Sequence, residues 1–252
     1  MIQRDTLVQY CDELLDTEAY RDYCPNGLQV QGREPIQRLV TGVTACQALL
    51  DAAVDRQADM LLVHHGYFWK GEDPRVIGMK HQRLLTLLQA GINLLAYHLP
   101  LDGHAELGNN ARLAALLGFT PQGRFGPADA PDLGWYGVLP QACPAQHLAE
   151  HLAAVLGRQP LLINAHERPL QRIGWCTGAA QSLIEPAALL GLDAFISGEV
   201  SEQTVHIARE MGISYLSAGH HASERYGVMA LGEHLAEHFS LDHEFIDIDN
   251  PV

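Results

Sequence analysis

The sequence has little positive charge and no long apolar run. Only 16 Lys and Arg residues accompany 30 Asp and Glu residues, so the formal net charge is −14 with histidines counted neutral. Such an acidic surface repels the phosphate backbone of nucleic acids, which argues against a broad nucleic-acid-binding face. No apolar stretch reaches the roughly 18 residues that a membrane-spanning helix requires. We therefore expect no membrane segment.

Cysteine is also scarce, since the chain holds only 5. They are scattered and no C-x-x-C pair occurs, so we expect neither a disulfide framework nor a cysteine zinc site. The segment 1–15 mixes charged and apolar residues like an amphipathic helix and lacks the apolar core of a signal peptide. These features predict a cytoplasmic protein. With 252 residues, 47% of them hydrophobic, the chain can bury a sizeable core.

What the sequence does contain is a regular alternation of strand-like and helix-like segments. In the first half, short apolar runs predict strands at 38–44, 58–65 and 92–98. Amphipathic stretches between and after them predict helices at 45–57, 79–91 and 107–118. This βαβαβ order is typical of an α/β fold with largely parallel strands.

The second half repeats this order, with strands expected at 172–178, 193–199 and 213–219 and helices at 179–191 and 201–212. An ungapped alignment of 38–65 with 172–199 matches Arg38 with Arg172, Gln47 with Gln181 and Asp59 with Asp193. Aligning 82–97 with 203–218 matches Gln82 with Gln203, Gly91 with Gly212, Ile92 with Ile213 and Leu95 with Leu216. The shared order of elements indicates an internal duplication.

The predicted fold is therefore α/β, with two similar halves and helices layered around mixed, largely parallel sheets. The first half covers 1–118 and the second covers 171–252. Between them, 119–170 begins with a loop-like stretch rich in Pro and Gly and continues with a helix at 143–157. We interpret 119–170 as a connecting or interface segment.

Metal-ligand residues follow several of the expected strands, where ligands of open α/β sheets bind. His64 and His65 end the strand at 58–65, and Asp102 follows the strand at 92–98. In the second half, His220 and Glu224 follow the strand at 213–219. If the halves pack face to face, these strand ends converge.

The spacing of these residues favours a centre with two metal ions. His220 and Glu224 are four residues apart, so on a helix they share one face. The neighbours His64 and His65 stand at a strand end, where each can bind a different ion. Imidazole and carboxylate ligands suit Zn²⁺, Mn²⁺ or Fe²⁺. Two divalent ions outweigh two carboxylates in charge, so the pocket would attract a small anionic substrate.

Each residue also has a structural interpretation. An isolated pair of histidines is more often structural, Asp102 could cap a turn, and Glu224 could be a solvated charge. Further histidines near the site, and the acid Glu199, are candidates for supporting or proton-transferring groups or for ordinary structural residues; the histidines are His98, His104 and His221. The aromatic run of Tyr67, Phe68 and Trp69 could stack on a flat ring of a substrate or belong to the core.

Six motifs along the chain resemble one family. They are NGLQVQG, TGVTACQALL, LVHHGYFWKG, YHLPLDGHAELGNN, DAFISGEVSEQT and AGHHASERYG. Together they resemble the GTP cyclohydrolase 1 type 2 homologs, and in particular their short bacterial YbgI-like members. The resemblance covers nearly the whole chain and is weakest at 119–170.

This resemblance implies two similar α/β halves, a dinuclear metal site between the halves, and a ring-shaped homohexamer built as a trimer of dimers. Carried over by motif, the family's metal ligands fall on His64, His65, Asp102, His220 and Glu224. Longer members of the family carry an inserted domain in the middle, which 119–170 is too short to hold.

Two functions from different classes are consistent with these residues. The first is a metal-dependent hydrolase that acts on a nucleotide or a similar small anion, in the manner of GTP cyclohydrolase 1 type 2. The alternative is a non-enzymatic carrier or chaperone of metal ions or of a metallocofactor. A ring that encloses DNA in repair is a third hypothesis, against which the acidic composition argues. Neither the metal, the substrate nor the general acid follows from the sequence.

Overall fold

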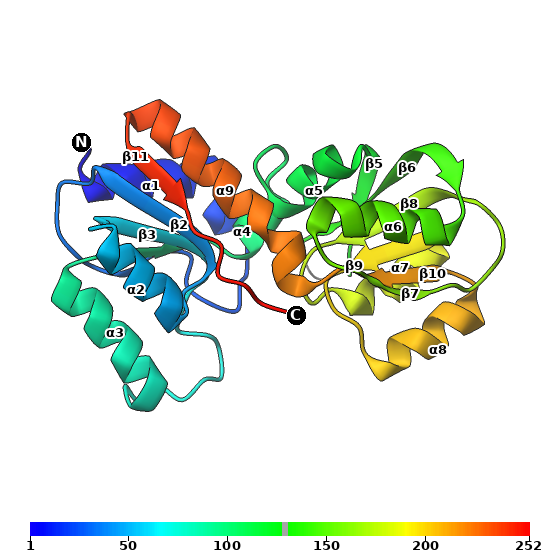
Figure 1. The fold of residues 1–252 in the computed structure, drawn as a ribbon, viewed down its shortest axis with the longest axis horizontal. Helices are drawn as coiled ribbons and strands as arrows, with labels where there is room; N and C mark the ends of the chain where they lie inside the picture. Colours follow the sequence, from blue (N-terminus) through cyan, green and yellow to red (C-terminus); the bar gives the residue numbers. More distant parts are fainter. Residues whose placement is uncertain (128–130) are drawn as a thin grey trace. The chain divides into compact units, whose positions relative to one another are not determined.

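The chain divides into two compact units of mixed α/β structure. The computed structural model describes residues 1–127 and 131–252 (Figure 1). The first unit comprises Met1–Gly108 and Gly227–Asp249, and the second comprises Asn109–Tyr226 and Asn250–Val252. The chain returns from the second unit to the first inside helix α9, His220–Phe239.

The sheet of the first unit has the strand order β1-β4-β3-β2-β11. Strands β4, β3, β2 and β11 are parallel to one another, and the edge strand β1 pairs with β4 in the antiparallel sense. Besides part of α9, its elements are α1 Arg4–Leu14, η1 Thr17–Ala19, β1 Gly27–Val30, β2 Arg38–Thr44, α2 Gln47–Asp55, β3 Met60–His65, α3 Gly78–Ala90, β4 Asn93–Ala96, α4 Leu99–Gly103 and β11 Asp242–Phe245.

Helices cover both faces of this sheet because its central strands are apolar on both sides. Along β3, Met60 and Leu62 pack with α1 and the C-terminal part of α9, whereas Leu61 and Val63 pack with α2 and α3. A strand buried on both faces shows a continuous apolar run rather than an alternating one. The continuous apolar run Met60–Val63 therefore indicates a strand in the interior of the sheet.

The sheet of the second unit has the strand order β5-β6-β8-β9-β10-β7. Strands β8, β9 and β10 are parallel to one another, and the outer pairings are antiparallel. The predicted α/β fold is thus confirmed, with a largely parallel first sheet and a mixed second one. The elements are α5 Asn109–Leu117, β5 Thr120–Phe125, β6 Gly134–Cys143, α6 Ala145–Leu156, β7 Leu161–Ile163, β8 Leu170–Cys176, η2 Gln181–Leu183, α7 Ile184–Leu189, β9 Ala194–Ser197, α8 Glu202–Met211 and β10 Ser214–Ser217.

The parallel strands of the two units pair in corresponding registers. Leu39 lies opposite Met60 in the first sheet, and Ile173 lies opposite Ala194 in the second. These pairs have the same offset as the ungapped sequence alignment of 38–65 with 172–199. Asn93 opposite Met60 and Ser214 opposite Ala194 follow the second alignment in the same way. The shared registers fit an internal duplication.

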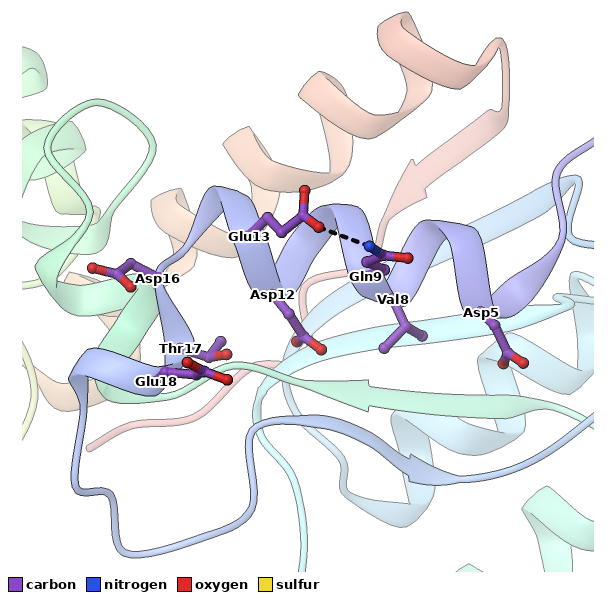
Figure 2. A pocket seen from close by; sticks show the side chains of 8 residues that line it. All are labelled: Asp5, Val8, Gln9, Asp12, Glu13, Asp16, Thr17 and Glu18. Atoms are coloured by element: carbon purple, nitrogen blue, oxygen red, sulfur yellow. Dashed lines mark hydrogen bonds between the residues drawn. The ribbon is translucent and has the colours of Figure 1, made fainter.

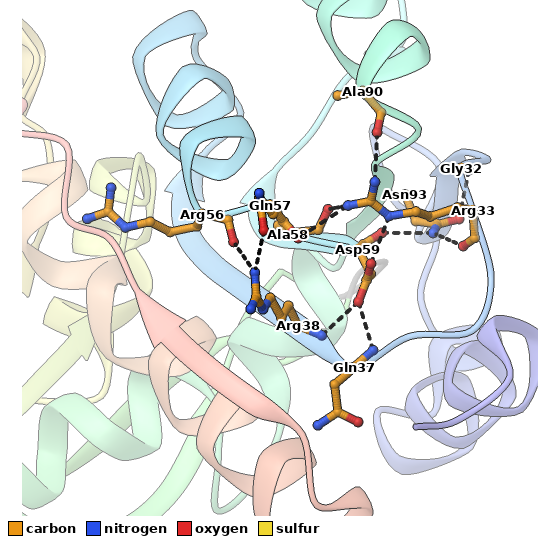
Figure 3. A network of polar contacts seen from close by, with 10 residues as sticks. All are labelled: Gly32, Arg33, Gln37, Arg38, Arg56, Gln57, Ala58, Asp59, Ala90 and Asn93. Carbon is orange, nitrogen blue, oxygen red and sulfur yellow. Dashed lines mark hydrogen bonds and ion pairs between the residues drawn. The ribbon is translucent and has the colours of Figure 1, made fainter.

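A partly buried carboxylate caps the start of the parallel strands in each unit. Oδ2 of Asp59 accepts the backbone N–H groups of Gln37 and Arg38, both at 2.9 Å (Figure 3). Oδ2 of Asp193 accepts the N–H groups of Gln171 and Arg172 at 3.0 and 2.9 Å. Asp59 and Asp193 are aligned with each other in the two halves of the sequence. Their identity is explained by the same backbone hydrogen bonds that both carboxylates accept.

The predicted boundaries of the halves differ from the two units. Residues 119–170 are not a connecting segment, because β5, β6, α6 and β7 belong to the second unit and its sheet; within this stretch, 128–130 lie outside the described residues. Helix α5 also belongs to the second unit rather than to the first half. Several of the Pro and Gly residues that suggest a loop lie in an outer strand pair, where β5 is an edge strand that tolerates Pro121.

Among the helices of the described ranges 1–127 and 131–252, none combines the length and apolar character needed to traverse a bilayer.

Candidate metal centre

His64 ends the buried part of β3 with its ring fixed by a neighbouring strand. The side chain is fully buried, and its Nδ1 lies 2.9 Å from the carbonyl oxygen of Tyr97. A carbonyl only accepts hydrogen bonds, so Nδ1 carries the proton and Nε2 presents its lone pair. Nε2 lies 3.6 Å from Oδ1 of Asp102 in the same unit. The ring of His64 is thus oriented so that Nε2 could bind a metal ion.

Two further imidazoles lie beside His64. The ring centroid of His65 is 4.6 Å from that of His64, and Nδ1 of His65 is 3.0 Å from Oγ1 of Thr44. The ring of His98 is 5.2 Å from His64 and 5.7 Å from His65. One nitrogen from each of these three residues lies within 4.8 Å of the others, which is close enough for one or two metal ions. The sequence places His98 only among the supporting or structural histidines.

Asp22 holds His98 in position, and sequence reasoning missed it. Oδ1 of Asp22 lies 2.7 Å from Nδ1 of His98, while Oδ2 accepts hydrogen bonds from the N–H of Leu99 and from Nδ2 of Asn26, both at 2.9 Å. Burial raises the pKa of Asp22, but the donors His98, Asn26 and Leu99 outweigh it, so the pKa lies below its ordinary value. The turn signal Asn26-Gly27 was the available hint, since Oδ1 of Asn26 accepts the N–H of His98 at 2.8 Å.

Asp102 reaches His64 because a short helix follows β4. His98 is the N-cap of α4, and the N–H of Asp102 donates to the carbonyl oxygen of His98 at 3.1 Å. This single turn brings Asp102 back toward the strand end that carries the imidazoles, and its side chain is buried. In the first unit, the predicted ligands His64, His65 and Asp102 thus lie together.

In the second unit, His220 and Glu224 share one face of α9, as their spacing predicts. Nε2 of His220 lies 3.0 Å from Oε2 of Glu224, and Nδ1 of His220 lies 2.7 Å from Oε1 of Glu199. Burial lowers the pKa of His220, but Glu224 and then Glu199 outweigh it and raise the pKa to about 9. Glu199 takes the supporting role, because it holds the ring by Nδ1 and keeps Nε2 directed at Glu224.

The two remaining histidine candidates, His104 and His221, make other contacts. Nδ1 of His104 accepts the N–H groups of Glu106 and Leu107 at 3.2 and 3.0 Å, so this ring caps a turn. The backbone N–H of His221 donates to the carbonyl oxygen of Val252 at 2.9 Å, which ties the C-terminal residue to the second unit. For His104 the structural interpretation holds.

Gly178 is a site residue that the sequence did not indicate. Its φ is +68°, and a Cβ added there would collide with Oε1 of Glu224 and lie 3.2 Å from Nε2 of His220. The carboxylate of Glu224 therefore occupies the space that a side chain would fill. Glycine is required at this position for two reasons. It adopts the left-handed φ without strain, and it leaves room for the carboxylate of Glu224.

The aromatic run after His65 divides into three roles. Tyr67 is buried and its hydroxyl donates to the carbonyl oxygen of Ala45 at 2.8 Å, so it belongs to the core. Phe68 is exposed and lies under the ammonium of Lys80, with 5.2 Å from Nζ to the ring centroid. Trp69 lies beside the imidazoles, with centroid distances of 5.0 Å to His98 and 6.0 Å to His65.

A separate hollow of about 580 Å³ opens along α1 and the turn after it (Figure 2). Its lining is strongly acidic and contains none of the predicted ligands: Asp5, Val8, Gln9, Asp12, Glu13, Asp16, Thr17 and Glu18. Carboxylates in this number repel an anionic substrate. The hollow is therefore unsuited to the substrate that the sequence predicts.

The donor groups of both units fit divalent transition metals. Each of four imidazoles directs Nδ1 to an oxygen of the protein, so that Nε2 is the nitrogen that would bind a metal; the pairs are His64 with Tyr97, His65 with Thr44, His98 with Asp22 and His220 with Glu199. Metal-binding histidines have this arrangement, because the outer hydrogen bond fixes the tautomer and the ring. Nitrogen donors with nearby carboxylates suit Zn²⁺, Mn²⁺ or Fe²⁺ and do not select among them.

Comparisons with known proteins agree with the motif resemblance. The family model described as Duf34/NIF3 (NGG1p interacting factor 3) matches residues 2–251. A protein of Pseudomonas aeruginosa named GTP cyclohydrolase 1 type 2 homolog is 55% identical over 100% of this chain and 99% of its own length. The Escherichia coli K12 protein of the same name is 55% identical over 98% of each chain.

Solved structures give the same result. A structure titled "protein ybgI, unknown function" has a TM-score of 0.96, 53% identity and full coverage of both chains. The structure of TTHA1606 from Thermus thermophilus has a TM-score of 0.88 with 34% identity, again over the full length of both chains. Reduced HcgD from Methanocaldococcus jannaschii, at 20% identity and a TM-score of 0.83, shares the fold.

Proposed function

The chain belongs to the Duf34/NIF3 family, and from this premise we propose that it is a two-metal hydrolase of a nucleotide or a similar small anion. The observation that carries the proposal is that, in each unit by itself, imidazoles held by Nδ1 lie with carboxylates at the strand ends. We propose His64, His65, Asp102, His220 and Glu224 as the ligands of two divalent ions. His98 stands beside His64 and His65 as an additional donor.

The charge of the site supports an anionic substrate. In a chain with a net charge of −14, two divalent ions would make this site a local positive centre. When bound, such ions lower the pKa of a coordinated water and polarise a phosphoryl or carbonyl oxygen of the substrate. The relatives are named as homologs of a GTP cyclohydrolase, which makes GTP the first substrate to test.

The protein's own groups have separate tasks in this proposal. Tyr97 and Thr44 hold the rings of His64 and His65 through Nδ1, so neither ring needs to reorient when an ion arrives. Glu199 does the same for His220. Preorganised donors lower the cost of assembling the transition state, because the polar groups are already aligned. Glu199 is a candidate for moving a proton at the substrate, and His98 is another if it does not itself bind an ion.

We also propose the assembly and location that the family resemblance implies. These are a homohexamer arranged as a trimer of dimers, in the cytoplasm. Exposed apolar side chains on and before α3 support self-association, because scattered single apolar residues are common but grouped ones often mark interfaces. They include Val76, Ile77, Met79 and Leu88. Sedimentation of the purified protein tests the hexamer.

The function is tested by turnover with defined metals. Purified protein is stripped with a chelator, reloaded with Mn²⁺, Zn²⁺ or Fe²⁺, and assayed with GTP for formate release and with a panel of phosphoesters. We expect metal-dependent turnover that His64→Ala abolishes. The matched control is His206→Ala, since His206 and Glu202 form an exposed i,i+4 pair at 3.0 Å like the buried pair of His220 and Glu224.

Binding without turnover would point to the alternative function. A protein that retains two ions through gel filtration, requires the proposed ligands to do so and hydrolyses no compound of the panel would be a metal or metallocofactor carrier. Turnover that persists unchanged in His64→Ala would reject the assigned centre.

A further inference from the structure

We propose that Trp69 and Tyr23 form an aromatic clamp that receives the planar heteroaromatic ring of a phosphorylated substrate beside the imidazoles. The inference rests on the proposed function and names its substrate class. It concerns the first unit alone, where both rings lie next to His98. The clamp is separate from metal binding, because neither side chain offers a donor atom of the kind that the imidazoles supply.

Trp69 is fixed next to the cluster by local contacts. Its ring meets that of His98 edge to face, at an interplanar angle of 84°. The indole N–H donates to the carbonyl oxygen of Gly66 at 3.2 Å, which restrains the ring. The preceding residue, Phe68, has a φ of +65°, a conformation that costs a bulky residue free energy. Strained backbone of this kind occurs at ligand-binding segments.

Tyr23 approaches the same imidazole from another loop. It is 61% exposed, and its ring centroid lies 6.4 Å from that of His98. The backbone N–H of Lys70 donates to the carbonyl oxygen of Tyr23 at 2.6 Å, so the loops that carry Tyr23 and Trp69 are joined directly. Neither ring belongs to a hydrophobic core cluster of the described residues. Large aromatic side chains outside the core, held beside a polar site, are typical binding surfaces.

The charges beside the two rings define the rest of the ligand. Arg21 and Lys70 are exposed and lie within two residues of Tyr23 and Trp69. The other basic residues that follow Trp69 are paired, Arg75 with Asp73 and Lys80 with Glu72. In an acidic protein, two exposed cations that neighbour the two aromatic residues in the sequence favour a flat ring that carries phosphate groups. Nucleotides have this combination, and phosphosugars without a base do not.

The test compares ligands with and without a ring. Calorimetry on metal-loaded protein measures GTP and inorganic tripolyphosphate, which share the phosphate chain. We expect GTP to bind at least about 10-fold more tightly, since stacking of a base on an aromatic side chain contributes this much or more. Trp69→Ala should remove the preference and leave tripolyphosphate binding unchanged. Trp69→Phe should keep most of it.

The matched control is Phe68→Ala. This ring lies in the same loop and is exposed, but it faces Lys80 rather than the imidazoles, so the preference for GTP should persist. Equal binding of GTP and tripolyphosphate by the wild type, or a preference that survives in Trp69→Ala within about twofold, would overturn the clamp. Equal loss of both ligands in Trp69→Ala would also overturn it, because that result indicates damage to the phosphate site.

A second measurement separates the clamp from the metal centre. Guanosine, which has the ring but no phosphate, is titrated into metal-free protein while tryptophan fluorescence is recorded. Quenching that disappears in Trp69→Phe supports the clamp even if no variant hydrolyses anything. Metal-dependent hydrolysis of ringless phosphoesters without such quenching would leave the proposed function standing and reject the clamp.

Discussion

Oε1 of Glu199 lies 2.7 Å from Nδ1 of His220, and the opposite nitrogen of that ring lies 3.0 Å from Glu224. The ring of His220 therefore lies between two carboxylates with different roles: Glu199 orients the ring, and Glu224 is a proposed metal ligand. Glu199 follows β9 and Glu224 lies one turn into α9, so strand and helix together determine the direction of Nε2. A carboxylate behind a metal-binding imidazole raises its basicity and prevents its rotation.

Replacing Glu199 should weaken metal binding without removing a ligand. We expect Glu199→Ala to lower the affinity for Zn²⁺ or Mn²⁺ about 10- to 100-fold, the usual effect of losing such an outer partner. Glu199→Gln should lose less, because its amide oxygen still accepts from Nδ1. Competition with a chromophoric chelator measures both.

The control for this prediction is Glu202→Ala. Glu202 contacts His206 at 3.0 Å on the exposed surface of α8, and its loss should leave metal affinity unchanged. If Glu199→Ala and Glu202→Ala bind the metal equally well, the supporting role of Glu199 is wrong.

The sequence predicted the parallel core of each unit because its signals are local and continuous. The run Met60–Val63 is apolar on both faces, and Gly91 and Gly212 end the helices α3 and α8 at φ values of +64° and +68°. The position of the candidate ligands followed from the same signals, since residues after parallel strands gather at one edge of a sheet. These inferences need no knowledge of distant contacts.

The outer strands of the second unit were not predictable in this way. In β5 and β6 the Pro and Gly residues hide the strand pattern, and only the pairing of β5 with β6 and of β6 with β8 establishes them as sheet. Gly137 illustrates the reason, because a Cβ there would collide with the carbonyl oxygen of Thr120 on the neighbouring strand. A close approach between two backbones leaves no periodic trace in the sequence.

The supporting residues of the site were missed for a related reason. Asp22 precedes His98 by 76 residues in the sequence, and nothing in its neighbourhood indicates that both its oxygens are used. His98 itself is a lone histidine between a strand and a helix. Only the turn at α4 reveals that it faces the imidazoles of His64 and His65.

Asp22 should matter for stability as well as for the site. Its carboxylate accepts hydrogen bonds from Leu99, Asn26 and His98, and its side chain is only 3% exposed. Asp22→Asn replaces one acceptor oxygen with an NH₂ group that faces a donor. Leaving a buried donor unsatisfied costs about 1–3 kcal/mol. Urea unfolding should therefore show a loss of this size.

Asp73→Asn is the control for Asp22→Asn. Asp73 pairs with Arg75 on an exposed loop, at 2.6 Å between Oδ2 and Nη2, and exposed ion pairs contribute little to stability. The urea midpoint should be unchanged in this variant. An equal midpoint for Asp22→Asn and the wild type would contradict the assigned role of Asp22.

Asp59 should make stability depend on pH in the acid range. Burial raises its pKa, but the N–H groups of Arg38 and Gln37 and the guanidinium of Arg33 outweigh it and hold the pKa below its ordinary value. Because the folded-state pKa is lower than the unfolded one, this contribution is present above the unfolded value of about 3.9 and is lost as pH falls through the folded pKa.

The measurement compares the wild type with Asp59→Asn in urea at several pH values. The wild type should be more stable at neutral pH, and the difference should shrink below about pH 4. A difference that grows on acidification would show that the sign is wrong. Gln171 and Arg172 receive the same support from Asp193 in the second unit, so Asp193→Asn should also destabilise the protein.

Gly178 gives the sharpest test of the second-unit site. An alanine there keeps the backbone chain intact but places a methyl group against Oε1 of Glu224 and near Nε2 of His220. We expect Gly178→Ala to displace Glu224 and to lower metal affinity at least about 10-fold, in the range seen when the partner of a metal ligand is disturbed.

Gly212→Ala separates this steric effect from backbone strain. Gly178 and Gly212 have the same φ of +68°, but a Cβ at Gly212 meets no described atom within 4 Å. Both substitutions should therefore carry a similar backbone strain, about 1 kcal/mol for a non-glycine residue at left-handed φ, and Gly178→Ala should cost more in total because of its collision with Glu224. Only Gly178→Ala should also reduce metal binding, as measured by elemental analysis after dialysis. If the two variants retain equal amounts of metal, Glu224 does not need the space that Gly178 leaves open, and its proposed role as a ligand fails.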